Sequence, residues 1–237
     1  MPRHPCFVAH IATRFSSWIF FSHVFRNDFF VVNYLGHLYL AGSDPDMQVG
    51  GLLGDFVKGP LRGDYPPRIE AGIRLHRRVD ALCDHLPAIR QLRDLFPAPW
   101  RRYGGIVIDV VFDHLLARDW DDFHPQPLGD FCQTFYRALA GHRALLPERA
   151  QAFCDRAPAL RWLESYRDAE QIPRVLAHIG QRLHHPVPLE QAWRPRQPFA
   201  ATFEPGFRGA MAALAMAIAT PEPGSAASPC LDVAVRL

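Results

Sequence analysis

Two stretches of the chain place acidic residues four positions apart among apolar neighbours. In the first, Asp80 follows His76 at this interval and Asp84 follows Asp80; in the second, Asp109 and Asp113 repeat it. Residues four apart lie on one face of an α-helix. An ionised carboxylate on an apolar face is costly unless it is paired or bound to a metal. The two stretches therefore predict buried charges that share one compensating ion.

A divalent cation is one ion that could fill this role. Histidine nitrogens and aspartate oxygens suit Mn²⁺, Fe²⁺ or Zn²⁺, and carboxylate-rich sites also accept Mg²⁺. The same spacing also arises from hydrogen-bonded structural residues and from ion pairs between helix turns. Two helices with the same feature favour a metal site more than one would, but spacing alone leaves both interpretations open.

The elements that must position these residues are predicted to be helices. Apolar periodicity indicates a helix over 68–86 and a very apolar one over 104–120. Further helices are predicted over 47–58, 88–96, 128–145, 148–155, 159–165, 172–183 and 203–219. No alternating strand pattern of useful length occurs, so the predicted fold is all-α, a single-domain helical bundle.

Composition narrows the class of protein. The 237 residues suffice for one domain with a sizeable core, and the formal net charge of +2 does not by itself argue for a nucleic-acid partner. Five scattered cysteines without a CxxC pair indicate neither a disulfide framework nor a cysteine-based zinc site. No apolar run approaches the roughly 18 residues that span a bilayer. We therefore expect a cytoplasmic protein in a reducing compartment.

The two ends of the chain differ from the rest. Residues 1–31 are rich in phenylalanine without a stable period, and we interpret them as an extension outside the natural protein, which would start at Val31 or Val32. Residues 220–237 are rich in proline, serine and alanine and are predicted to be disordered. The predicted domain is thus 32–219.

Four blocks of the chain resemble the motifs of the acyl carrier protein phosphodiesterases (ACP hydrolases), which are related to HD-type metal phosphohydrolases. The blocks lie, in the order of the family, at 33–41, 50–59, 71–80 and 109–116. The similarity covers roughly 33–217, and its first block begins directly after Val32. Gly36 and Gly51 depart from it at places where relatives often carry Ala and Asn.

The resemblance implies an HD-phosphohydrolase-like helical fold and an activity. The family hydrolyses the phosphodiester that joins 4′-phosphopantetheine to a serine of holo-acyl carrier protein, and it uses a divalent cation, commonly Mn²⁺. Carried over by motif, the metal-ligand candidates are His37, Asp55, His76, Asp80, Asp109 and Asp113, with Asp84 and His114 as further candidates. The catalytic candidates among them are Asp55, His76, Asp80 and Asp113.

The expected chemistry follows from a cation that lowers the pKa of a water and polarises a phosphoryl oxygen. The cations Lys58, Arg77 and Arg78 are candidates for holding the phosphate and for meeting the acidic surface of a carrier protein. Two alternatives stay open: a metal phosphohydrolase that acts on another phosphoester such as a nucleotide, and a non-catalytic protein that binds the carrier.

Overall fold

Every regular element in the part of the chain that the structure describes is helical. The computed structural model describes residues 34–193 and 200–220. Its α-helices are α2 (Tyr34–Leu40), α3 (Pro45–Leu53), α4 (Pro67–Cys83), α5 (Pro87–Asp94), α6 (Gly104–Arg118), α7 (Trp120–Phe123), α8 (Leu128–Gly141), α9 (Glu148–Leu160), α10 (Trp162–Ser165), α11 (Gln171–Arg182) and α12 (Ala200–Ala219). Short 3₁₀ helices lie at Trp100–Tyr103, Arg143–Leu145 and Leu189–Ala192.

One connected hydrophobic core joins these helices from α2 to α12. The predicted all-α, single-domain fold is therefore confirmed, while its likeness to HD phosphohydrolases stays a prediction. The predicted extension over 1–31 lies outside the described residues, as does the predicted disordered tail apart from Thr220. No helix in the described part is both long and apolar enough to cross a membrane.

Prolines and one aspartate set the starts of the helices around the site. Pro45, Pro67 and Pro87 each occupy the first position of a helix, where the missing amide hydrogen costs nothing. Asp44 caps α3 by accepting hydrogen bonds from the amides of Asp46 and Met47. The predicted helices start at residues 47, 68 and 88, so the observed starts lie one or two residues earlier.

The end of α3 differs from the prediction. The helix stops at Leu53 and not at residue 58, because the glycine-rich segment weakens it and the chain then turns tightly. The amides of Phe56 and Val57 both donate to the carbonyl of Leu53 in this turn. Asp55 consequently lies in a turn and not on a helical face.

Two glycines let α3 and α4 cross with their backbones in contact. A Cβ atom built on Gly50 would lie 2.1 Å from the carbonyl oxygen of Ile69, and one on Gly72 would lie 2.2 Å from that of Met47. Any larger residue at either position must push the helices apart. This close approach brings the turn after α3 beside the middle of α4.

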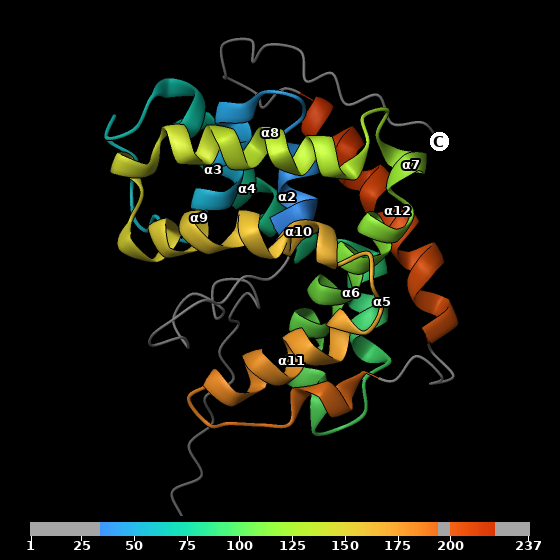
Figure 1. Ribbon diagram of the computed structural model, residues 1–237. Coiled ribbons are helices and arrows are strands. Elements are labelled where there is room, and N and C mark those ends of the chain that lie inside the picture. The colour runs from blue at the N-terminus through green and yellow to red at the C-terminus, as the bar shows by residue number, and fades with distance from the viewer. Residues whose placement is uncertain (1–33, 194–199, 221–237) are drawn as a thin grey trace, which may run out of the picture.

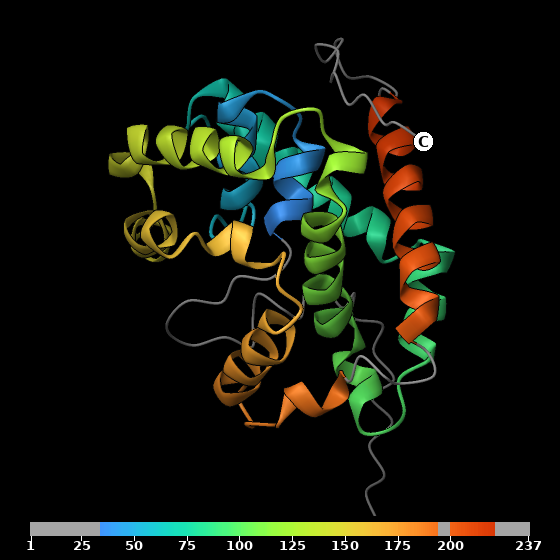
Figure 2. The same cartoon turned by 45° about the vertical axis from the view of Figure 1, so that its right-hand side comes forward.

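The helices surround the short α2, all of whose residues are buried (Figure 1). It packs against α3 and α6, and α8 packs against both α3 and α9. α12 runs along one outer side of the molecule in both views, against α4, α5 and α6 (Figures 1 and 2). The residues that could do chemistry thus lie where α2, α4 and the turn after α3 meet.

Candidate metal centre

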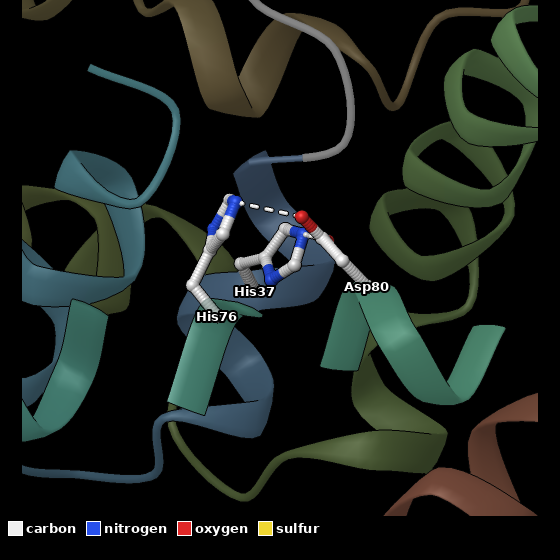
Figure 3. A group of neighbouring side chains, drawn as sticks. All are labelled: His37, His76 and Asp80. Carbon is white, nitrogen blue, oxygen red and sulfur yellow. Dashed lines mark ion pairs between the residues drawn. The ribbon is translucent and has the colours of Figure 1, made fainter. Parts of the chain in front are cut away.

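Three side chains from two helices converge beside the turn after α3. His37 comes from α2, and His76 and Asp80 come from α4 (Figure 3). One nitrogen or carboxylate oxygen from each lies within 4.8 Å of the others. The two Asp80 oxygens each lie 3.3 Å from an imidazole Nε2, Oδ1 from that of His37 and Oδ2 from that of His76. The structure thus brings together residues that the sequence predicted as ligands from separate elements.

The imidazole of His76 is held from two sides. Its Nδ1 donates a hydrogen bond of 2.7 Å to the carbonyl of Gly51, which turns Nε2 toward the carboxylates. Its ring stacks on that of His37 with centroids 3.8 Å apart and planes 21° apart. A Cβ atom on Gly54 would lie 2.1 Å from Cγ of His76, so this ring occupies space that a side chain at position 54 would fill.

Asp55 completes the cluster from the turn after α3. Its Oδ1 lies 3.6 Å from Nε2 of His76. The side chains of Asp55 and Asp80 are 36% and 23% exposed, whereas those of His37 and His76 are each 2% exposed. The imidazoles therefore line the buried side of the centre, and a substrate must approach from the side of the carboxylates.

The charges of the cluster shift the ionisation of its members. Burial alone would lower the pKa of His76, but Asp80 and Asp55 outweigh it and raise the pKa to about 10. Burial would raise the pKa of Asp80, but His76 and His37 hold it well below its usual range. Burial and the neighbouring His76 lower the pKa of His37. Two imidazoles thus share one strongly acidic carboxyl group.

This donor set fits a divalent transition-metal ion. Two imidazole nitrogens and carboxylate oxygens are ligands that Mn²⁺, Fe²⁺ and Zn²⁺ accept. The bond from Nδ1 of His76 to a carbonyl is the outer contact that orients metal-binding histidines. Oδ1 of Asp80 is buried and accepts no hydrogen bond from the described residues. His37, His76 and Asp80 would hold the ion, with Asp55 at its open side.

Asp113 lies outside this cluster and is engaged elsewhere. Its two oxygens accept hydrogen bonds from the amides of Leu35 (3.1 Å) and Gly36 (2.9 Å), at the start of α2. Burial raises the pKa of Asp113 to about 7, although these hydrogen bonds oppose the shift. Asp113 therefore positions the helix that carries His37. This contact joins residues far apart in sequence, and no local pattern signals it.

The other candidates, Asp109 and His114 of α6 and Asp84 at the end of α4, lie outside the cluster. Asp109 is 7% exposed and lines, with His37, a small cavity of about 20 Å³. Burial, and after it Asp80, raise the pKa of Asp109 well above its usual value. His114 donates from Nδ1 to the carbonyl of Tyr166 (2.8 Å), and Asp84 follows the last residue of α4. None of the three belongs to the group of converging ligand atoms.

The predicted substrate-binding cations divide between two places. Arg78 donates to the carbonyls of Ala217 (2.7 Å) and Thr220 (3.0 Å) and so holds the end of α12. Arg77 donates to the carbonyl of Val57 (2.8 Å) and braces the turn after α3. Lys58 lies in that same stretch: burial lowers its pKa, while Asp55 and Asp80 oppose the shift. Lys58 and Arg77 therefore lie near the centre, at the turn after α3, whereas Arg78 binds the end of α12.

Comparison with known proteins agrees with the motifs. A family model described as acyl carrier protein phosphodiesterase matches residues 32–214. The chain is similar to a protein named acyl carrier protein phosphodiesterase from Yersinia pestis, with 38% identity over 182 residues that cover 73% of this chain and 94% of the relative. A protein of that name from Escherichia coli O6:H1 is 37% identical over 166 residues, which cover 68% and 84% of the two chains. No solved structure matches.

Proposed function

Because the chain belongs to the acyl carrier protein phosphodiesterase family, we propose that it hydrolyses the phosphodiester between 4′-phosphopantetheine and the serine of holo-acyl carrier protein. The convergence of His37, His76 and Asp80 carries the proposal, since these side chains could hold a cation beside the partly exposed carboxylate of Asp55. The proposed cation is Mn²⁺. The proposed place of action is the cytoplasm, where carrier proteins are made and used.

We assign the residues of the centre different roles according to how deeply each side chain is buried. The two buried imidazoles and Asp80 would hold a divalent cation, which supplies positive charge to the phosphoryl oxygens and lowers the pKa of a water. Asp55 is the more exposed carboxylate and lies 3.6 Å from His76, on the side from which a substrate arrives. We assign Asp55 the role of general base because an accessible carboxylate can reach the attacking water.

The reaction balances with water as the only other reactant. The water oxygen forms a bond to phosphorus while the bond from phosphorus to the serine oxygen breaks. Asp55 takes one proton from the water, and that proton ends on the serine oxygen. The products are apo-carrier protein and free 4′-phosphopantetheine. Lys58 and Arg77 stand on the side of the cluster where the phosphate charge must enter.

The decisive experiment is a mass measurement on the carrier. Holo-carrier protein is incubated with the metal-free protein, with and without added Mn²⁺, and the intact mass of the carrier is recorded. We expect the carrier to lose the mass of phosphopantetheine only when Mn²⁺ is present, and chelator to prevent the loss. Turnover of nucleotides without turnover of the carrier would favour another phosphohydrolase, and carrier binding without any turnover would favour a non-catalytic role.

A further inference from the structure

Arg149 lies on a helix that the sequence did not connect with the centre. It is the second residue of α9, one turn before Phe153 on the same face. The Phe153 ring packs edge-on against Tyr34 with centroids 5.4 Å apart, and the Phe56 ring also packs against Tyr34, with centroids 6.2 Å apart. Phe56 follows Asp55 directly. The face of α9 that carries Arg149 is therefore turned toward the open, acidic side of the centre.

Arg149 and Lys58 are both exposed, and neither forms an ion pair or a hydrogen bond with any described residue. Among the other exposed arginines, Arg143 pairs with Asp155 at 2.8 Å and Arg208 with Asp122 at 3.0 Å, whereas Arg62 and Arg174 also lack a partner among the described residues. Two neighbouring cations that lack a counter-ion repel each other, and an anion between them offsets this repulsion.

The charges of the two residues reach each other. Burial, Arg77 and Arg149 lower the pKa of Lys58, against the opposing pull of Asp55 and Asp80. Lys58 therefore lies within electrostatic range of both the carboxylates of the centre and the guanidinium of Arg149. Arg77 fixes the backbone next to Lys58 through the carbonyl of Val57. The turn after α3, helix α4 and helix α9 thus each contribute one cation, and those of α4 and α9 both act on Lys58.

We propose that Arg149 and Lys58 together bind the anionic phosphodiester group of the substrate at the mouth of the centre. The inference rests on the proposed function for the identity of that substrate. A guanidinium presents two parallel donors to a phosphate, and an ammonium adds a compact charge from the other side. The pair offsets the repulsion between a negative substrate and the carboxylates of Asp55 and Asp80.

Chemical protection tests the pair without requiring any hydrolysis. Lys58 is the only lysine of the chain, so its modification by an amine-reactive reagent can be followed in one peptide by mass spectrometry. We expect inorganic phosphate to slow the modification of Lys58 in the unaltered protein and to lose this effect in Arg149→Gln. Equal protection in both proteins, or none in either, would overturn the proposal even if carrier hydrolysis is confirmed.

Kinetics then separate the phosphate from the rest of the carrier. Holo-carrier protein and bis(4-nitrophenyl) phosphate, a small diester, are compared as substrates for Arg149→Gln and Arg149→Lys. For Arg149→Gln we expect KM to rise about tenfold for both substrates, the scale of one charge-assisted hydrogen bond, with kcat little changed. Arg149→Lys should restore part of the loss. A rise in KM with the carrier alone would assign Arg149 to the protein surface of the carrier and overturn the proposal.

The matched control is Arg137→Gln, which makes the same change of charge on α8. Arg137 is exposed, and its only hydrogen bonds within the described residues are with Gln133 and Thr134 of its own helix. We expect its KM and its protection by phosphate to equal those of the unaltered protein. If Arg137→Gln raised KM as much as Arg149→Gln, net charge and not the position of Arg149 would explain the effect, and the proposal would fall.

Discussion

Helices α4 and α6 carry the same four-residue spacing of ionisable residues, His76 and Asp80 on α4 and Asp109 and Asp113 on α6, in different surroundings. On α4, His76 and Asp80 meet His37 at a partly open site, where Asp80 is 23% exposed. On α6, Asp109 and Asp113 are 7% and 1% exposed and lie beside the site. Spacing therefore fixes a shared helical face, but the neighbours of that face decide whether its carboxylates meet imidazoles, as Asp80 does, or backbone amides, as Asp113 does.

Removing Asp80 should have the largest effect of any change in either helix. In Asp80→Ala we expect turnover of holo-carrier protein to fall by more than about a hundredfold, because even an outer contact of a metal ligand is worth up to about that factor. Bound metal should be lost as well. Metal analysis and the carrier mass assay measure the two effects, and unchanged circular dichroism would show that the helices persist. Full activity would refute the assignment of α4.

Adding one methyl group at Gly54 tests whether turnover depends on the position of the His76 imidazole on α4. A Cβ atom there would lie 2.1 Å from Cγ of His76, so Gly54→Ala must displace the imidazole. We expect turnover to fall by about tenfold or more while the helix content is kept. Gly51→Ala is the matched control, because its Cβ would make only ordinary contacts, the nearest with the carbonyl oxygen of His37 at 3.4 Å. Equal loss in both variants would contradict this reading of the turn.

The buried carboxyl group of Asp113 should make the free energy of unfolding depend on pH. Its pKa is raised by burial from 3.8 to about 7 in the folded protein, so the folded state holds a proton that the unfolded state releases. The stability from this proton is fully present below about pH 4 and is lost as the pH rises to about 7, by roughly 1.4 kcal/mol per pH unit at most.

The Asp113→Asn variant isolates this effect because the amide does not titrate in this range. The free energy of unfolding of the unaltered protein, minus that of Asp113→Asn, should decline from about pH 4 to about pH 7 and stay level above it. Denaturant titrations at several pH values measure the difference. A difference that is independent of pH would show that Asp113 is ionised throughout, as a carboxylate bound to a cation would be.

Asp109→Asn should have the smallest effect. Burial raises the pKa of Asp109 well above its usual value, which favours the neutral carboxyl group, and an amide matches that form in charge. We expect turnover and metal content to change by less than about tenfold. Loss of bound metal, as in Asp80→Ala, would make Asp109 a ligand and would end the distinction between α4 and α6.

The sequence predicts the α4 half of this comparison better than the α6 half. The interval from His76 to Asp80 is a local property of one helix, and the motif resemblance added His37 and Asp55. The use of Asp113 depends on a contact with Gly36, 77 residues away, which no periodicity expresses. The sequence analysis did not identify Arg149 for the same reason, because its position near the centre follows from the packing of α9 against Tyr34.

Local signals had a similar limit in the fold. The predicted starts at residues 47 and 68 lie within two residues of the observed starts of α3 and α4, because the proline and aspartate signals at those starts act within a few residues. The end of α3 was predicted at residue 58 and lies at Leu53. Glycines weaken a helix but do not by themselves say where it stops, and here the tight turn around Leu53 decides it.

The contact between Gly50 and Gly72 has a consequence for attempts to make this protein more heat-resistant. Replacing helical glycines by alanine is a common way to stabilise a protein, since it restricts the unfolded chain. At these two positions the added methyl would instead strike a carbonyl group of the facing helix, 2.1 to 2.2 Å away. The same crossing sets the distance between Asp55 and His76. Substitutions that raise the thermal stability of this protein should therefore be sought in helices other than α3 and α4.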